Sequence, residues 1–137
     1  MKILFDLDVL VDVVSRWTQF PESLALFEQI VGSAKHEGAF PGCGYTTLYY
    51  VLCKALTIEE ALAAVSLLRE RLEMLPFDER TAQVAHGLKM KDLVDACVAA
   101  TAVQKTCQVI ATRNVADYAR SPIPAKSPAD LLRIVRA

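Results

Sequence analysis

The sequence predicts an α/β fold built on a parallel sheet, and three observations lead to this prediction. Short apolar runs at 3–5 and 109–112 are rich in strand-forming residues. Longer segments whose apolar residues have helical spacing alternate with them. The run Ile3-Leu4-Phe5 is apolar throughout, which is typical of a strand covered on both faces at the centre of such a sheet.

Each element in the first part of the chain follows from a local pattern. After a strand near 2–6, helical spacing predicts helices over 8–16 and 22–35, separated by a break at Trp17–Pro21. A short strand that ends at turn residues is predicted from Gly38 to Gly42. Helical spacing returns in the next segment, over 46–56.

The middle of the chain continues this alternation. A capping box at Thr57-Ile58-Glu59-Glu60 begins a predicted helix over 58–72. The short apolar run at 74–77 is a possible strand. Asp78 is a candidate cap for a helix that runs to about Leu88.

The last part contains the most apolar helix and a second central strand. Residues 91–106 are apolar nearly all round, which predicts a helix buried against other elements. A strand over 109–112 follows, and then a turn or short helix over 113–118. Pro122 to Pro124 form a loop around a possible edge strand, and Ser127-Pro128 begins the last helix.

Composition indicates a compact globule, with residues 1–137 forming a single domain. The chain is 53% hydrophobic and 23% charged. Its formal net charge is −1, so a polyanion would have to be held by a local patch or by a metal. No apolar run reaches the ~18 residues of a membrane span, and the N-terminus lacks the features of a signal peptide.

The cysteines favour a cytoplasmic protein. Cys43, Cys53, Cys97 and Cys107 form no C-x-x-C motif, and the two histidines stand alone, so a zinc site is not expected. Cys97 lies in an apolar run, which predicts a buried, reduced thiol.

Three segments carry acids that the predicted sheet brings together. Asp6 ends the first strand, and Asp117 follows the strand at 109–112 by five residues. In open α/β sheets, ligands bind just beyond the carboxyl ends of the strands. Asp92 and Asp95 are three residues apart at the start of the buried helix and share a face. We therefore expect Asp6, Asp95 and Asp117 to converge, with Asp92 nearby.

Such a cluster predicts a metal site. Carboxylates repel one another, and burying them unpaired is costly. A hard cation such as Mg²⁺ or Mn²⁺ prefers carboxylate and water oxygens and would remove that cost. It can also activate water and stabilise a phosphoryl transition state. The candidate metal ligands are Asp6, Asp95, Asp117 and Asp92, and the first three are also the candidate catalytic residues.

Simpler roles exist for several acids. Asp6 and Asp92 could each act only as a helix cap. Asp8 and Asp12 are interpreted as first-turn acids that the helix dipole favours.

Substrate contacts are expected beside the acids. Thr112 and Asn114 either bind substrate or only satisfy backbone groups of a turn. The nearby basic residues are either ordinary solvated charges or a rim that holds phosphate; they are Lys89, Lys91, Arg113, Arg120 and Lys126. The candidate substrate-binding residues are Thr112, Arg113, Asn114 and Lys91.

Four blocks occur in order along the chain. Residues 3–10 read I-L-F-D-L-D-V-L, residues 46–50 read T-T-L-Y-Y, residues 92–96 read D-L-V-D-A, and residues 112–118 read T-R-N-V-A-D-Y. Together they resemble the PIN-domain family of metal-dependent nucleases, whose first block contains D-T-N-V-L and whose third reads D-F-E-D-A. The resemblance covers nearly the whole chain.

This resemblance implies a three-layer α/β/α sandwich with a central, mostly parallel sheet. It also implies cleavage of single-stranded RNA with Mg²⁺ or Mn²⁺. Many members are toxins of toxin–antitoxin pairs and dimers are common, so an antitoxin protein and a second copy of the chain are expected partners. The apolar composition also favours a homodimer, with the helices over 22–35 and 58–72 as candidate contacts.

The chain departs from the family pattern at two places. Thr47 stands where the family has its second acid, so a metal would lose one full carboxylate. Leu7 and Asp8 replace the usual Thr and Asn after the first Asp, and Asp8 could restore part of the lost charge.

Two alternatives to an active nuclease follow. A PIN-like domain that has lost activity could serve as an RNA- or protein-binding module, and Thr47 is the main argument for it. Phe5-Asp6-Leu7-Asp8 also resembles the D-x-D motif of haloacid-dehalogenase-type phosphatases, although Val9 replaces the glycine of that motif.

Overall fold

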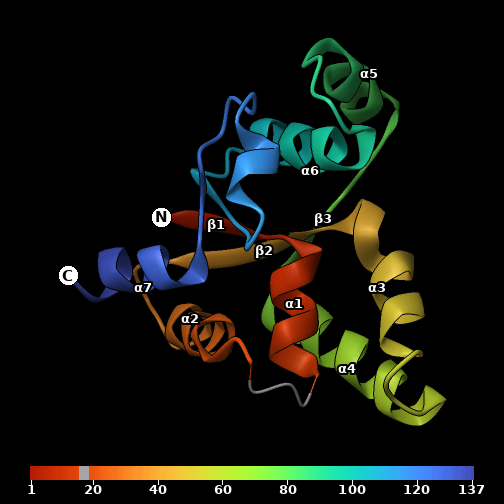
Figure 1. The fold of residues 1–137 in the computed structure, drawn as a ribbon, viewed down its shortest axis with the longest axis vertical. Helices are drawn as coiled ribbons and strands as arrows, with labels where there is room; N and C mark the ends of the chain where they lie inside the picture. Colours follow the sequence, from red (N-terminus) through yellow and green to blue (C-terminus); the bar gives the residue numbers. More distant parts are fainter. Residues whose placement is uncertain (16–18) are drawn as a thin grey trace.

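The computed structural model describes residues 1–15 and 19–137, and a parallel sheet lies at its centre (Figure 1). The strands have the order β3-β2-β1-β4-β5, and every pairing is parallel. Strands β1 and β4 are neighbours, which confirms the predicted centre of the sheet. The strand bounds are β1 (Lys2–Phe5), β2 (Glu37–Pro41), β3 (Glu73–Leu75), β4 (Val109–Ala111) and β5 (Ala125–Lys126).

Helices fill the connections between the strands. They are α1 (Leu7–Val14), α2 (Pro21–Val31), α3 (Tyr45–Leu52), α4 (Ile58–Arg71), α5 (Glu79–Gly87), α6 (Leu93–Gln104) and α7 (Pro128–Arg136), with 3-10 turns η1 (Gly42–Gly44) and η2 (Val115–Tyr118). The predicted break at Trp17–Pro21 lies partly outside the described residues. Helix α2 ends before the predicted residue 35 because the Ser33 hydroxyl accepts the backbone N–H groups of Lys35 and His36, which forms a turn.

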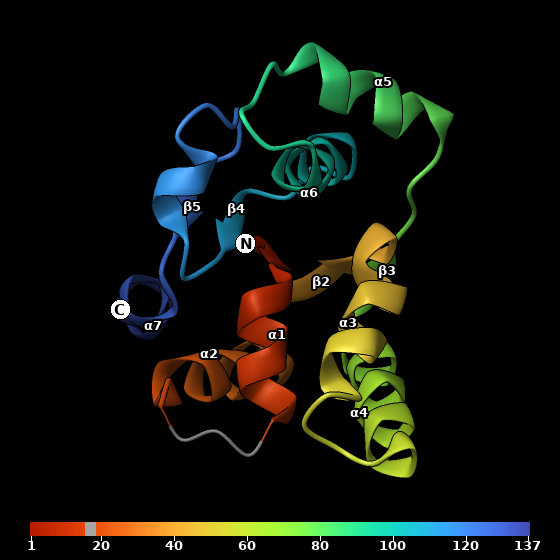
Figure 2. The ribbon, with the colours of Figure 1, turned by 45° about the vertical axis from the view of Figure 1, so that its right-hand side comes forward.

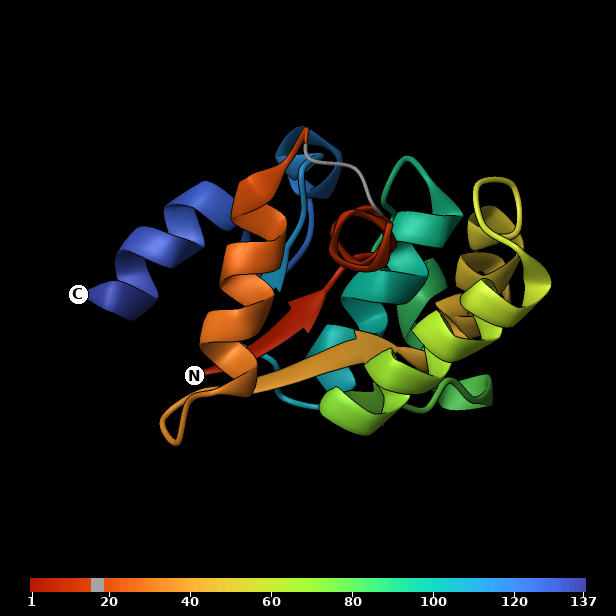
Figure 3. The same ribbon diagram turned by 90° about the horizontal axis from the view of Figure 1, so that it is seen from below.

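The sheet is covered on both faces, as the alternation of side chains along the strands requires. Ile3 and Phe5 pack on the face that α1, α2, α4 and α7 cover. Leu4 and Ile110 pack on the opposite face, against α6, and α5 lies outside α6. Figures 2 and 3 show these layers from two further directions. The predicted three-layer α/β/α fold is confirmed.

Local signals position the helix starts. The Thr57–Glu60 capping box is present at α4, and Asp78 caps α5. Asp92 and Ser127 cap α6 and α7. The buried helix predicted over 91–106 is α6, which is mostly buried from Ala96 onward, whereas Leu93 and Val94 in its first turn are exposed. No helix in the described ranges is both long and apolar enough to span a bilayer.

The four cysteines are free thiols, as expected, although Cys97 is only half-buried. The expectation of full burial fails because Cys97 lies on the side of α6 that faces away from the sheet-covering residues Val98 and Ala99.

The strand order creates a switch point between β1 and β4. The chain adds β2 and β3 on one side of β1, whereas β4 and β5 extend the sheet on the other side. In open α/β sheets, ligands bind outside the carboxyl ends of the strands at such a switch point. The Asp6 N–H donates to the Ala111 carbonyl at 2.9 Å, so the ladder holds the residues after β1 and β4 together. The fold thereby places Asp6 beside Thr112.

Candidate functional site

Asp6 joins the two central strands through its side chain. One carboxylate oxygen accepts the Leu7 N–H at 2.8 Å and caps α1. The other accepts the Thr112 hydroxyl at 2.9 Å and the Tyr118 hydroxyl at 3.0 Å. Capping therefore uses only one of the two oxygens, and the second faces the segment that follows β4.

Asp8 lies beside Asp6 in the first turn of α1. Its Oδ2 accepts the Arg113 N–H at 2.9 Å, the Asn114 side-chain amide at 3.2 Å and the Thr112 hydroxyl at 3.4 Å. Burial and then the charge of Asp6 raise the pKa of Asp8 to about 6. The role in the first turn is thus present, but the carboxylate also points at the loop after β4.

Asp92 and Asp95 bring a second pair of carboxylates to this edge. Asp92 caps α6 by accepting the Val94 N–H at 2.7 Å. Asp95 is half-buried, and burial followed by the charges of Asp92, Asp6 and Asp117 raises its pKa to about 6. Because the charges of the other three acids all raise the pKa of Asp95, the four carboxyl groups share a local electrostatic environment.

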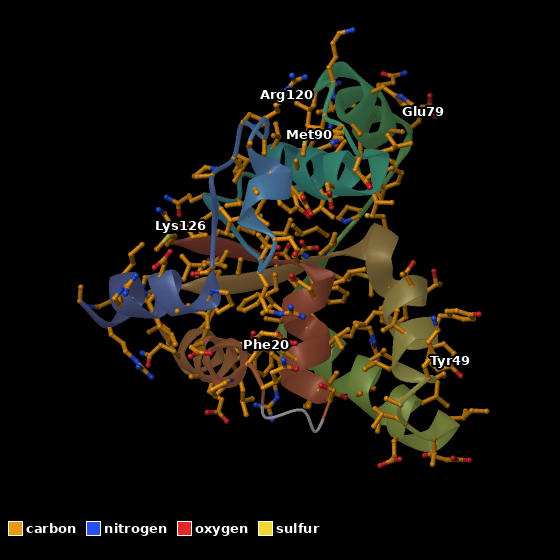
Figure 4. All side chains as sticks on the ribbon, viewed as in Figure 1. Phe20, Tyr49, Glu79, Met90, Arg120 and Lys126 are labelled. Atoms are coloured by element: carbon orange, nitrogen blue, oxygen red, sulfur yellow. The ribbon has the colours of Figure 1, made fainter. Side chains whose placement is uncertain are left out.

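A cleft of about 550 Å³ opens in front of Asp95. Asp92, Asp95 and Asp117 line its acidic part, and Lys91 and Arg120 line its basic part. Arg120 is labelled beside α6 and η2 in Figure 4. The cleft therefore combines oxygen donors with cations, as a phosphate-containing ligand bound through a metal would require.

Tyr118 was not selected from the sequence, yet its hydroxyl touches the acids directly. The ring is buried, and burial followed by the charge of Asp6 raises the pKa of Tyr118 well above its ordinary value. The phenol therefore remains a hydrogen-bond donor to Asp6. Its place after Asp117 in the fourth block was the only sequence signal for this contact.

Asp12 has a different role from the one predicted. The interpretation as a first-turn acid is wrong, because Asp12 lies in the second turn of α1 and is buried. Its carboxylate accepts Arg113 Nε at 2.8 Å and the Ser23 hydroxyl at 2.7 Å. Burial of this charge is offset by the guanidinium beside it.

Other candidates lie at the margin. Thr47 is exposed in the first turn of α3, and Asn114 is exposed beside Asp8. The start of α3 is close to α1, because a Cβ atom on Gly44 would lie 2.6 Å from a methyl group of Leu7. Lys126 contributes its backbone carbonyl, which accepts the Thr112 N–H at 3.0 Å.

The donor chemistry of this edge suits a hard divalent cation. Carboxylates supply the oxygens that Mg²⁺ and Mn²⁺ prefer, and a cation would offset both the burial and the repulsion between acids that raise the pKa values of Asp8 and Asp95. Within residues 1–15 and 19–137, however, no three acidic, histidine or cysteine side chains are arranged as ligands of one ion. Binding would require these side chains to move closer together.

The sequence matches the profile of the family described as PIN domain over residues 2–116. The chain belongs to the PIN domain family. This membership replaces the phosphatase alternative, because it assigns the Asp6–Asp8 stretch to the first block of a PIN domain. A search of curated proteins found no match.

Solved structures share the fold of this PIN domain. A chain of VapBC2 from Rickettsia felis, solved with a promoter DNA fragment, superposes with a TM-score of 0.74 at 15% identity, covering 93% of this chain and 98% of that one. FitAcB from Neisseria gonorrhoeae superposes with a TM-score of 0.71 at 18% identity, covering 93% of this chain and 98% of that one. VapBC-1 from nontypeable Haemophilus influenzae superposes with a TM-score of 0.71 at 16% identity, covering 94% of this chain and 99% of that one.

We predict that Asp95→Asn raises the Tm of the metal-free chain at neutral pH. The folded-state pKa of about 6 exceeds the ordinary 3.8, so the contribution of Asp95 to stability falls as pH rises from about 4 to about 6. Above that range the ionised carboxylate is repelled by neighbouring acids, and the amide is not. Thermal unfolding at about pH 7.5 and about pH 5 should show a gain that shrinks in acid.

The matched control for this measurement is Glu70→Gln, which neutralises an exposed acid on α4. It should leave the Tm nearly unchanged at both pH values. A lower Tm for Asp95→Asn at neutral pH would contradict the prediction that repulsion from neighbouring acids destabilises the ionised Asp95.

Proposed function

We propose that this PIN domain cleaves single-stranded RNA with Mg²⁺ or Mn²⁺ and acts as the toxin of a toxin–antitoxin pair. The observation that supports the proposal best is that Asp95, which lines the cleft beside Asp92 and Asp117, lies close enough to three other acids to feel their charges. Burial, followed by the charges of Asp92, Asp6 and Asp117, raises the pKa of Asp95 to about 6. Burying carboxylates close to one another costs free energy, and a bound cation would offset that cost.

Each acid has a proposed role at the metal. Asp95 and Asp117 of the cleft, together with Asp6 after β1, would hold the metal, and Asp92 would support them from the cap of α6. A bound Mg²⁺ or Mn²⁺ supplies Lewis acidity and activates water at neutral pH. Lys91 and Arg120 are placed to contact phosphate oxygens of the RNA.

The hydroxyl donors set the orientation of the first acid. Thr112 and Tyr118 both donate to Asp6 Oδ2, so they hold that carboxylate in one rotamer. Asn114 is exposed next to Asp8 and is the group of this loop best placed for a substrate contact.

An antitoxin partner is proposed from the structural neighbours. The neighbours reported above are the VapBC2, FitAcB and VapBC-1 assemblies, and this chain shares the fold of one chain in each. A cytoplasmic location fits the free thiols at all four cysteines, because reducing compartments keep cysteines unpaired.

An inactive, binding-only PIN domain is the second candidate. It is favoured by the neutral Thr47 and by the absence, within the described ranges, of three side chains already arranged as metal ligands. Such a domain would bind RNA or protein without cleaving RNA at any Mn²⁺ concentration.

The test of the proposed activity is a gel assay on single-stranded RNA beside a calorimetric Mn²⁺ titration. Asp6→Asn should weaken Mn²⁺ binding and lower cleavage by at least about 100-fold, because even outer partners of metal ligands contribute roughly 10- to 100-fold. Asp130→Asn changes an exposed acid on α7 and should leave both measurements unchanged. Mn²⁺ binding and cleavage by Asp6→Asn at the wild-type level would sink this assignment.

We also predict that Thr47→Glu tightens Mn²⁺ binding and raises RNA cleavage. Two unit charges about 4 Å apart interact by about 4 kcal/mol at an effective dielectric near 20, before desolvation is subtracted. Restoring a carboxylate should therefore help, by less than that figure. The wild type should need excess metal and prefer Mn²⁺.

Thr46→Glu is the matched control, because Thr46 is also exposed and precedes Thr47 in the same turn of α3. It should change neither the Mn²⁺ affinity nor the cleavage rate. Equal behaviour of the two variants would show that position 47 lies outside the site.

A homodimer through α2 and α4 is our third prediction here. Exposed apolar side chains lie on both helices, with Ile58 60% and Leu62 53% exposed, and Leu24 and Leu67 also accessible. Light scattering should give twice the mass of the chain. Leu62→Glu should shift the population to monomer, whereas Ile134→Glu on α7 should not. A wild-type monomer at high concentration would contradict this assembly.

A further inference from the structure

We propose that Arg113 is a positioning residue, which anchors the segment after β4 to α1 and α2 and thereby orients Asp6 and Asp8. The sequence suggested a substrate contact for Arg113, and the geometry points to a different role. Its consequence for catalysis rests on the proposed function, whereas the anchoring itself can be tested without RNA or metal.

The guanidinium is engaged by a buried carboxylate. Arg113 Nε donates to Asp12 Oδ2 at 2.8 Å, and Nη2 donates to Oδ1 at 3.3 Å. The Asp12 side chain is 1% exposed, and the Ser23 hydroxyl donates to its Oδ2 at 2.7 Å. Two parallel N–H···O contacts fix the plane of a guanidinium as well as its position.

An aromatic ring supports the same guanidinium from its face. Arg113 Cζ lies 3.9 Å from the centre of the Phe20 ring. Phe20 immediately precedes α2 and is labelled between α1 and α2 in Figure 4. The side chain is therefore held by α1 through Asp12 and by Phe20 at the start of α2, and Ser23 of α2 in turn holds the Asp12 carboxylate.

Arg113 and its neighbours in the chain donate hydrogen bonds to the acids of the site. The Arg113 N–H donates to Asp8, and the adjacent Thr112 hydroxyl donates to Asp6. The Asn114 N–H in turn donates to the Thr112 hydroxyl oxygen at 3.1 Å. Because these residues are consecutive, a fixed Arg113 side chain restricts both the Arg113 peptide N–H that donates to Asp8 and the Thr112 residue whose hydroxyl donates to Asp6.

Lys91 and Arg120 provide the contrast. Both are exposed and line the cleft, so their charges are available to phosphate oxygens. Arg113 is exposed as well, but it does not line the cleft, and its guanidinium donates to Asp12 and stacks on Phe20, on the side of α1 and α2. A substrate contact and an anchor therefore predict different kinetic effects.

The experiment compares Arg113→Lys with Lys91→Ala. Lysine keeps the charge but cannot reproduce the planar double contact or the stacking on Phe20. Arg113→Lys should lower kcat and Mn²⁺ affinity by about tenfold, as loss of an outer partner of metal ligands does, with little change in KM. Lys91→Ala should raise KM and reduce its salt dependence, because it removes a phosphate contact.

A double variant tests whether Arg113 acts through Asp12. Asp12→Asn/Arg113→Gln should lower kcat by no more than Arg113→Gln alone, since residues that act as one unit are not additive. If the kcat losses of the Asp12 and Arg113 substitutions multiply in the double variant, the proposal that Arg113 acts through Asp12 is overturned. A rise in KM and a smaller salt dependence for Arg113→Lys, with kcat and Mn²⁺ affinity unchanged, would establish a substrate contact and overturn the proposal.

Amide hydrogen exchange separates this inference from the proposed function. In the metal-free chain, Arg113→Lys should speed exchange of the amides of residues 113 and 114, which donate to Asp8 and Thr112. If the wild type neither binds Mn²⁺ nor cleaves RNA, the nuclease proposal fails, and faster exchange still supports the anchor. Unchanged exchange overturns the anchor whatever the activity.

Discussion

The parallel pairing of β1 with β4 is the constraint on which the site depends. It brings residue 6 beside residue 112, although 106 residues separate them. The Asp6 N–H extends the ladder by one bond to Ala111, so both chains leave the sheet at a fixed separation. Such switch points are where open α/β sheets bind ligands, and the cleft lined by Asp92, Asp95 and Asp117 lies near Asp6. Residues 3–5 of β1 and 109–111 of β4 are buried beneath this edge, and sites built on such packed strands are positioned precisely.

Electrostatics at this edge is unbalanced in a way that a simple structural role does not explain. Structural acids usually pair with a cation, as Asp12 does with Arg113. At Asp8 and Asp95, by contrast, burial and then the charges of neighbouring carboxylates raise the pKa. Functional sites commonly retain such costs, since the same repulsion favours a cation when one binds. The hydroxyls of Thr112 and Tyr118 partly offset the cost at Asp6 by donating to one oxygen.

The hydrogen bonds around Asp8 modify the argument from family resemblance. Asp8 stands where the resembled pattern has asparagine, and it lies directly beside Asp6. Its Oδ2 already accepts donors from the loop after β4, so part of its charge is used to hold that loop. Asp8 therefore adds negative charge to the edge, but it does not occupy the position of Thr47 on α3. Membership of the PIN domain family establishes the fold and the block order, whereas the strength of the metal site depends on these local differences.

The sequence by itself determined the order of helices and strands and the two central strands, and it predicted that Asp6, Asp95 and Asp117 gather at one edge of the sheet. Those features depend on apolar periodicity, caps and strand ends, which are local and readable along the chain. Only the tertiary structure decided the roles of Asp12, Arg113 and Tyr118. Their partners are far away in sequence, and nothing local distinguishes a surface arginine from one stacked on Phe20 and paired with a buried acid. Contacts of this kind depend on side-chain packing between elements, which periodicity does not encode.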